Sequence, residues 1–420
     1  KIKEVKGLEV LDSRGNPTVE AEVRTKLGVF RAMVPSGASA GSHEALELRD
    51  MGHRFLGEGV QHAVRNVDGE LARTVKGMDV GDQHAIDSRM IDKDGTSDKS
   101  RLGANAILAV SMAACKAGAA AKKKSVFDHI GKLYGGKAHV MPVPLSNVIN
   151  GGKHAGQAHD VQEHMIIPIG AKHLKEAVEI ESEIYHVLGN MIKGKFGPAG
   201  GLVADEGGYA PPKLRGMENR FDLILKAADE VGYTKKIALG IDVAANEIKV
   251  GDYYVLGRKK YSAQSLLKYY SNLVEEYPLI SIEDPFTEDD WEHWRLMEKF
   301  MGKKVQIVGD DLFVTNTERI IKGIALDAAN AVLVKVNQIG TVTEALDACD
   351  VARQKKWNII VSHRSGETED NFIADLAVGV NAGQCKFGAP AHSDRNAKYN
   401  QLLRIEEELG RKAKYDGNLL

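Results

Sequence analysis

The sequence predicts an α/β protein whose second half is a barrel of parallel strands. Short runs of Ile, Val and Leu each end in a charged or polar residue, which is typical of strands buried on both faces. From Glu283 onward these end residues recur roughly every 25 residues, the length of one strand, one helix and two short loops. The runs and their end residues are Ile237–Ile241 with Asp242, Leu279–Ile282 with Glu283, Val305–Val308 with Asp310, Ala331–Val334 with Lys335, Ile359–Ser362 with His363, and a shorter run with Lys386.

Polar residues at the end of every run favour a closed barrel, because a parallel barrel carries its active site at the carboxyl ends of its strands. An open, doubly wound sheet shows the same alternation of strands and helices and is the alternative architecture. The interval between Asp242 and Glu283 is longer than the others and does not fit a single repeat.

The N-terminal third is expected to form a separate α+β domain. Residues 1–65 alternate strand-like pieces with turns at Asn16-Pro17 and Leu27-Gly28, which indicates an antiparallel meander, and residues 60–124 favour helix. The segment 131–138 matches the phosphate-binding pattern G-x-x-x-x-G-K, but Ala138 replaces the required Ser or Thr, so we interpret it as a linker. We expect an N-terminal α+β capping domain at 1–136 and a catalytic α/β barrel at 137–420.

Composition excludes several classes of function. The formal net charge of −2 over 420 residues gives no electrostatic case for nucleic acid or an anionic membrane as a partner. No apolar run approaches the ~20 residues that a membrane helix requires, and the first residues lack a signal-peptide core. The three cysteines form no C-x-x-C pair, and Cys349 falls at the spacing of a helix core. We therefore expect a cytoplasmic protein.

Three acids at successive strand ends indicate a metal site. Asp242, Glu283 and Asp310 offer only oxygen ligands, and this donor set suits a hard divalent ion, magnesium before manganese, rather than zinc. Each acid taken alone is more often a helix cap or a solvated loop charge. The six small residues at 36–41 let the backbone approach a ligand closely or move as a flap, although a plain flexible loop has the same composition.

Other polar residues at strand ends suggest proton transfer beside an anion. Burial and a nearby cation would disfavour the charged form of Lys335 and allow it to act as a base, and a buried lysine paired with a carboxylate is the alternative. Arg364 and Ser365 offer a donor fork and a hydroxyl suited to phosphate. With two further acids, Glu163 and Glu206, these groups predict proton abstraction next to a carboxylate, with the enolate held by cations.

Longer motifs show a family resemblance. They are LDSRGNPTVE at 11–20, VPSGAS at 34–39, LGANAILAVSMA at 102–113, NGGKHAG at 150–156, DEGG at 205–208, SIEDPF at 281–286, LVKVNQIGT at 333–341, SHRSGETED at 362–370 and NQLLRIEEELG at 400–410. Over essentially its whole length the chain resembles the enolase family. This resemblance implies an eight-fold barrel that opens with two strands and then two helices. It also implies reversible dehydration of 2-phospho-D-glycerate to phosphoenolpyruvate in glycolysis and gluconeogenesis.

The resemblance also implies residue roles. Lys335 would take the proton at C2, and Glu206, with Glu163 beside it, would protonate the departing C3 hydroxyl. Two magnesium ions would bind per active site, the first on Asp242, Glu283 and Asp310 and the second between Ser39 and the phosphate. Substrate-binding residues would be His154 (on a closing loop), Gln162, Glu163, Lys335, His363, Arg364 and Ser365 (at the phosphate) and Lys386 (at the carboxylate).

The chain departs from the family pattern at three positions that are not catalytic. Ala40 stands where Thr is usual, His164 where Phe is usual, and His392 where Arg is common. Two other functions compete: a racemase or sugar-acid dehydratase of the same superfamily, and a binding relative that has lost catalysis. The Arg364-Ser365 phosphate pair disfavours the first, and the intact Lys335 and Glu206 disfavour the second. A homodimer or a dimer-based oligomer is the expected assembly.

Overall fold

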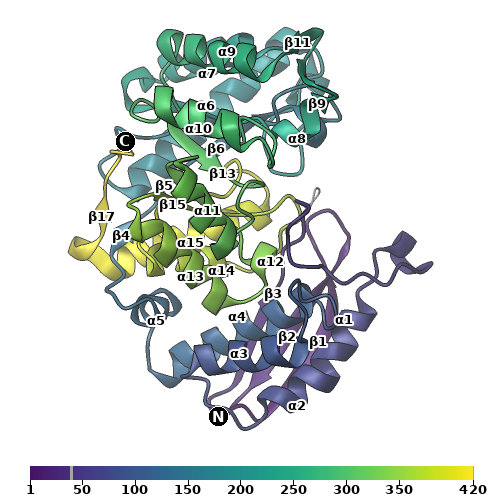
Figure 1. The fold of residues 1–420 in the computed structure, drawn as a ribbon. Helices are drawn as coiled ribbons and strands as arrows, with labels where there is room; N and C mark the ends of the chain where they lie inside the picture. Colours follow the sequence, from purple (N-terminus) through teal and green to yellow (C-terminus); the bar gives the residue numbers. More distant parts are fainter. Residues whose placement is uncertain (38–40, 420) are drawn as a thin grey trace.

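The computed structural model describes residues 1–37 and 41–419, which form an N-terminal part below a larger barrel part in Figure 1. The N-terminal part begins with an antiparallel sheet in the order β1 (Glu4–Leu11), β2 (Pro17–Arg24) and β3 (Val29–Met33). Its first hairpin turns between Leu11 and Pro17, which face each other in the register. The predicted meander is therefore confirmed.

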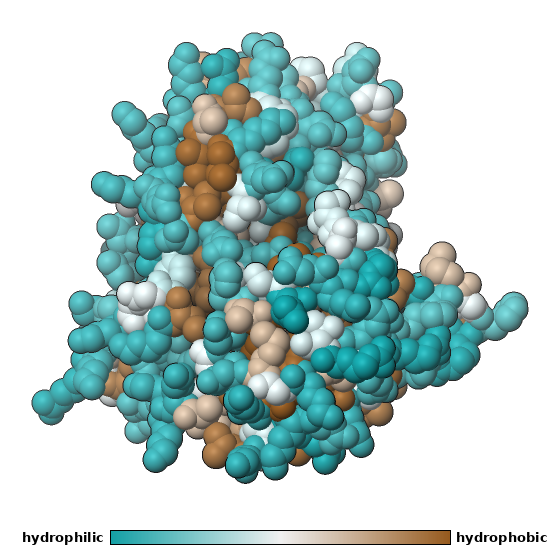
Figure 2. All heavy atoms as spheres, turned by 60° about the horizontal axis from the view of Figure 1, so that its bottom comes forward, coloured by the Kyte–Doolittle hydropathy of each residue, from teal (hydrophilic) through white to brown (hydrophobic). Residues whose placement is uncertain are grey.

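Helices cover one side of this small sheet. They are α1 (Gln61–Asn66), η2 (Val67–Leu71), α2 (Ala72–Val75), α3 (Gln83–Asp94), α4 (Ala104–Ala121) and α5 (Val126–Leu133). By length and composition α4 could cross a membrane, but 83% of it is buried inside the protein, where it packs on β2 and β3. The face in Figure 2 is mostly hydrophilic. In Figure 1 the purple segment around η1 (Arg54–Gly57) projects sideways from the N-terminal part.

The second part is a nine-stranded sheet that closes on itself. Its end strands β5 and β6 are separated only by Leu145, whose N–H donates to the carbonyl of Cys385 at 2.7 Å. The alternative of an open sheet is therefore wrong. The strand order is β5 (Val143–Pro144), β16 (Gly383–Lys386), β15 (Asn358–Ser362), β14 (Ala331–Val334), β13 (Gln306–Gly309), β12 (Leu279–Glu283), β8 (Ala238–Asp242), β7 (Glu163–Ile167) and β6 (Ser146–Asn150).

The barrel opens irregularly. Strands β6 and β7 are antiparallel and are followed by two helices, α6 (Leu174–Phe196) and α7 (Met217–Glu230), before β8 begins. This is the opening that the resemblance implies. The long interval after Asp242 holds α8 (Ala245–Ile248) and a small antiparallel sheet of β9 (Lys249–Val250), β10 (Tyr253–Leu256) and β11 (Lys259–Tyr261).

From β12 onward strands and outer helices alternate as the repeat predicts. Inside the barrel, Val308, Leu333, Ile360 and Met165 form a compact apolar cluster below the strand ends. A larger core lies between the strands and the helices and includes Cys349, as its spacing predicts. The remaining elements are α9 (Ala263–Glu276), α10 (Trp291–Met301), α11 (Thr317–Leu326), α12 (Val336–Ile339), α13 (Val342–Gln354), α14 (Phe372–Gly379), α15 (Ser393–Leu409), η3 (Gly152–Ala155), η4 (Pro198–Gly201), η5 (Thr234–Lys236), η6 (Gly410–Lys412), β4 (Val140–Met141) and β17 (Lys414–Tyr415).

Candidate active site

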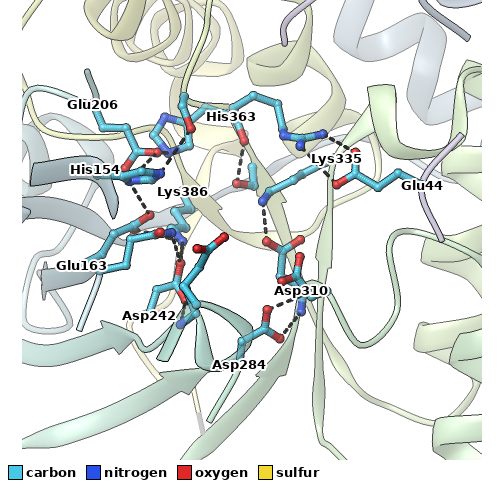
Figure 3. A pocket seen from close by; sticks show the side chains of 17 residues that line it. Glu44, His154, Glu163, Glu206, Asp242, Asp284, Asp310, Lys335, His363 and Lys386 are labelled. Atoms are coloured by element: carbon cyan, nitrogen blue, oxygen red, sulfur yellow. Dashed lines mark hydrogen bonds and ion pairs between the residues drawn. The ribbon is translucent and has the colours of Figure 1, made fainter. Parts of the chain in front are cut away.

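A polar pocket lies at the carboxyl ends of the parallel strands (Figure 3). Parallel register brings the end residues together, because Glu283 pairs with Asp242 and Lys386 with Ser362. Strand β7 runs the other way, so its first residue, Glu163, also faces Asp242 at this rim. The lining residues are Glu44, His154, Gln162, Glu163, Glu206, Asp242, Ala244, Glu247, Asp284, Asp310, Asp311, Lys335, Ser362, His363, Arg364, Ser365 and Lys386.

The structure thus brings most of the sequence-predicted site residues to one pocket. Glu283 lies just behind the lining, where Lys386 donates to its Oε2 at 2.8 Å. Ser39 and Ala40, the predicted metal contact and the flap departure, lie outside the described residues. The flap hypothesis therefore stays a prediction.

Lys386 is the centre of charge compensation on one side of the pocket. Its Nζ lies 2.9 Å from Glu163, 2.8 Å from Glu283 and 3.4 Å from Asp242. Burial disfavours the ammonium, but these carboxylates outweigh it and raise the pKa of Lys386 well above its ordinary value. Burial and Asp242 also raise the pKa of Glu283 to about 8. Lys386 is therefore a fixed positive charge at neutral pH.

Lys335 is held by a single carboxylate. Its Nζ donates to Asp310 Oδ2 at 2.5 Å, and its backbone N–H donates to the hydroxyl of Thr315. Burial disfavours the ammonium, but Asp310 outweighs burial and raises the pKa of Lys335. The direction is opposite to the one expected for a base near neutral pH, and matches the paired-lysine alternative.

Across the pocket, two glutamates and two histidines face one another. His154 Nδ1 lies 3.5 Å from Glu206 Oε1 and 3.9 Å from Glu163 Oε1. Burial and the neighbouring Glu206 raise the pKa of Glu163 well above its ordinary value, whereas His154 outweighs burial and holds the pKa of Glu206 well below it. The opposite directions make Glu163 the more readily protonated of the two acids.

His363 is neutral in this environment, because burial lowers its pKa well below the ordinary value. The guanidinium of Arg395 donates to its Nδ1 at 2.8 Å, so the ring proton is on Nε2, 3.7 Å from Glu206. Arg395 is completely buried and also donates to the carbonyls of Arg364 and Ser365. It fixes the whole 363–365 segment, and sequence reasoning missed it because its helix shows no local signal.

The Arg364 guanidinium faces both domains of the chain. It donates to Glu44 at 2.9 and 3.1 Å and to the side-chain oxygen of Asn337 at 3.0 Å. The neighbouring Ser365 hydroxyl lies 3.3 Å from His154 Nε2. Glu44 was also missed, although it lies three residues after the small-residue segment 36–41, because a charge in a loop carries no pattern. The resulting cluster has a donor fork and a hydroxyl on one wall.

The pocket also fits a divalent metal. Asp242, Glu283 and Asp310 are nearly fully buried and offer only oxygens, and Glu283 Oε1 has no hydrogen-bond partner among the residues described. An orphaned buried carboxylate oxygen is what a hard cation satisfies. Two compact ligand groups also occur in the described chain: Asp284 with Asp310 and Asp311, and His154 with Glu163 and Glu206.

The structure describes two of the three positions at which the chain departs from the family pattern. His164 is completely buried behind the pocket, and its ring lies edge-on to that of Phe221, with 5.8 Å between the ring centroids. The imidazole therefore takes the place of an apolar ring. Burial lowers its pKa well below the ordinary value and keeps it neutral. His392 precedes α15 with φ of 62°, and lines a surface cleft with Leu11 and Glu367 instead of the pocket.

Comparisons with known proteins agree over the full length. The family described as the enolase N-terminal domain matches residues 2–130, and the enolase C-terminal TIM barrel domain matches residues 138–420. The enolase of Pyrococcus furiosus is 55% identical over 413 residues, covering 97% of this chain and 95% of the relative. The enolase of Methanocaldococcus jannaschii is 53% identical and that of Solanum lycopersicum 50%, each covering 99% of this chain and 97% of the relative. The chain belongs to the enolase family.

Proposed function

We propose that the pocket in Figure 3 is where this chain carries out the family's reaction. The chain is a lyase that converts 2-phospho-D-glycerate to phosphoenolpyruvate and water, reversibly, in glycolysis. The observation that carries the site proposal is the division of the pocket into a lysine wall and a glutamate wall. Lys335 stands on one side, and the Glu163–Glu206 pair stands on the other.

The lysine wall supplies the base. We propose that Lys335 Nζ removes the proton at C2, and that Thr315, which holds the lysine's backbone, keeps the side chain aimed into the pocket. Asp242, Glu283 and Asp310 would hold a magnesium ion, and the Ser39 segment a second one. Magnesium held there would supply positive charge that stabilises the enolate and offsets the pull of Asp310 on the Lys335 proton.

The glutamate wall supplies the acid. Glu206 would pass to the departing C3 hydroxyl a proton taken from Glu163, whose pKa is raised, so that Glu163 ends the step as a carboxylate. His363 Nε2 lies 3.7 Å from Glu206 Oε1, beyond hydrogen-bond distance, and places the N–H edge of the ring beside the Glu206 carboxyl group. The side-chain amide of Gln162 donates to Asp242 at 3.3 Å. This bond connects the glutamate wall to one of the acids that would bind the metal.

The substrate's two anionic ends would be held separately. Arg364 and Ser365, next to His363, suit the phosphate, because a planar fork binds two of its oxygens at once. Lys386 is a fixed buried cation and suits the carboxylate end. His154 contacts Ser365 and would close over the phosphate from its loop. A racemase or sugar-acid dehydratase has no use for such a phosphate wall.

Several broader features are part of the proposal. We propose the division into a capping domain at 1–136 and a barrel at 137–420, which the limits of the two family matches support. A homodimer or dimer-based oligomer is supported by apolar side chains left exposed on β1, Leu8 at 54% and Leu11 at 55%. A cytoplasmic location agrees with three buried, unpaired cysteines.

The test is the absorbance of the enol ester product after 2-phosphoglycerate and magnesium are added to the protein. We expect product to form only with both present, and chelation of magnesium to stop it. The Lys335→Ala variant, prepared in the same way, controls for contaminating activity. No absorbance change with folded wild-type protein would contradict the proposed function.

A further inference from the structure

The His154 loop connects two neighbouring barrel strands, β6 and β7. It leaves β6 at Asn150, forms the single turn η3, and returns to β7 at Glu163. Two backbone hydrogen bonds close the loop. At its base, called the neck below, the Gly151 N–H donates to the carbonyl of Gln162 at 2.8 Å, and in its middle the Gln157 N–H donates to the carbonyl of Gly152 at 2.7 Å. Its tip carries His154 into the pocket (Figure 3), so the position of the loop decides the position of the imidazole.

A buried arginine, Arg220, lies beneath this loop. Arg220 comes from α7, is completely buried, and donates to both oxygens of Asp160, at 3.0 and 2.6 Å. The same guanidinium donates to the side-chain oxygen of Gln157 at 3.2 Å and to the carbonyl of Leu214 at 3.0 Å. The arginine thus connects the helix to the descending half of the loop at two separate points.

The loop's first glycine leaves room for this contact. A Cβ on Gly151 would lie 2.9 Å from Arg220 Nη1, closer than carbon atoms approach in folded proteins, and 2.3 Å from the carbonyl of Val161. Any side chain at Gly151 would therefore push the guanidinium away or open the neck. Both halves of the loop, at Gly151 and at Asp160, are packed against the same buried group.

We infer that Arg220 is a positioning residue. Its contacts to Asp160 and Gln157, called the latch below, hold the His154 loop so that the imidazole lies next to Glu206 and Ser365. The inference rests on the proposed function, because it gives the arginine a role only through His154. A planar fork fixes both distance and direction, whereas a lysine provides a single point charge. The distances that depend on the latch are those from His154 Nδ1 to Glu206, 3.5 Å, and from Nε2 to Ser365, 3.3 Å.

The alternative is an arginine that only stabilises the fold, and a double-mutant cycle separates the two. We would compare Arg220→Lys, His154→Gln and the double variant by kcat and KM with 2-phosphoglycerate and magnesium, below their melting temperatures. A small displacement of a positioned group can cost ~10²-fold, so we expect Arg220→Lys to lower kcat/KM about 10- to 100-fold. The double variant should match His154→Gln alone within about twofold, because the latch acts through the same imidazole.

The Arg215→Ala variant is the matched control. Arg215 also lies near Asp160, at 3.4 Å, but its side chain is 53% exposed and makes no bond to Gln157. We expect Arg215→Ala to retain kcat/KM within about twofold, since exposed ion pairs contribute little. Gln157→Leu offers a second route, because it removes one latch point while the buried ion pair remains. Its kcat/KM should fall in the same direction as that of Arg220→Lys, by a smaller factor.

Hydrogen exchange provides a readout that does not depend on catalysis. In Arg220→Lys the amides of Ala155, Gly156 and Gln157 should exchange faster, while those of α7 keep their protection. The latch is overturned if Arg220→Lys keeps wild-type kcat/KM, if the losses in the double variant multiply, or if the loop amides are unchanged. If wild-type protein shows no turnover, the proposed function fails and the exchange result still decides whether the latch exists.

Discussion

Buried carboxyl groups occur in two very different settings in this molecule. At the pocket, Glu163, Asp242 and Glu283 all lie within ion-pair distance of one ammonium, that of Lys386. On α6, Glu181 is just as deeply buried, yet neither of its oxygens has a hydrogen-bond partner in the part of the chain that the structure describes. The first group is a network of compensated charge, and the second is a single isolated acid.

The difference shows how burial is offset. In the pocket, opposite charges offset the cost of burial, because carboxylates keep Lys386 charged and His154 keeps Glu206 ionised. No charged neighbour offsets the burial of Glu181, which raises its pKa well above the ordinary value of 4.5, and the residue carries its own proton instead. Pocket acids should therefore govern turnover and metal binding, while Glu181 should govern only stability and its pH dependence.

The largest effect is expected from variants that remove either the proposed base or the proposed acid of the pocket. Lys335→Ala should abolish both turnover and exchange of the C2 hydrogen with solvent, since general-base help alone is worth ~10²–10⁴ in rate. Glu206→Gln should lose turnover but keep C2 exchange, because the proton can still leave and return. Deuterium wash-out from 2-phosphoglycerate, followed by NMR in both variants, is the measurement. Exchange that survives in the lysine variant would reverse the assigned roles.

The next effect is on metal binding. Asp310→Asn removes one charged oxygen ligand and also frees Lys335 from its 2.5 Å partner. The local fold should persist, because the backbone N–H groups of Asp310 and Asp311 bond to Asp284, which is unchanged. We expect magnesium to bind at least about tenfold more weakly, since a hard-ion site depends on the number of its charged ligands. Calorimetric titration with magnesium tests this, and unchanged affinity would exclude Asp310 as a ligand.

Sequence patterns predicted the barrel well because its strands repeat. The runs that end in Asp242, Glu283, Lys335 and Lys386 appear as β8, β12, β14 and β16, and register alone brings their ends to one rim. The small sheet from β9 to β11 was not predicted, because it inserts between two repeats and lies outside the barrel.

The parts of the site that sequence did not reveal depend on contacts between distant segments. Arg220 and Arg395 lie on helices where nothing in the local pattern separates them from surface arginines, yet both are completely buried. The pKa of Lys335 is raised, which sequence patterns did not reveal, for a related reason. It is set by the 2.5 Å approach of Asp310, and no spacing of residues along the chain contains that distance.

A smaller effect is expected at Glu181. Its folded pKa is raised, so the folded protein binds a proton that the unfolded chain releases above about pH 4.5. The contribution of Glu181 to stability is therefore greatest below that pH and falls as the pH rises toward the folded pKa. Glu181→Met removes an unpaired buried carboxyl group and should stabilise the protein by about 1–3 kcal/mol at neutral pH. Thermal unfolding at several pH values should show a flatter profile than wild type, and an equal slope would contradict the assignment.

The smallest effect is expected where charge is fully solvated. Lys304 and Glu275 form an ion pair with a distance of 2.6 Å, as short as those in the pocket, but their side chains are 63% and 64% exposed. Water screens both groups, and ordering two long side chains costs entropy, so such pairs are worth about 0–1 kcal/mol. Lys304→Ala should shift the free energy of unfolding by less than about 1 kcal/mol and leave its pH profile unchanged. Urea unfolding of this variant beside Glu181→Met measures both under one condition. A larger loss from Lys304→Ala would mean that the length of an ion pair, and not its burial, decides its contribution in this protein.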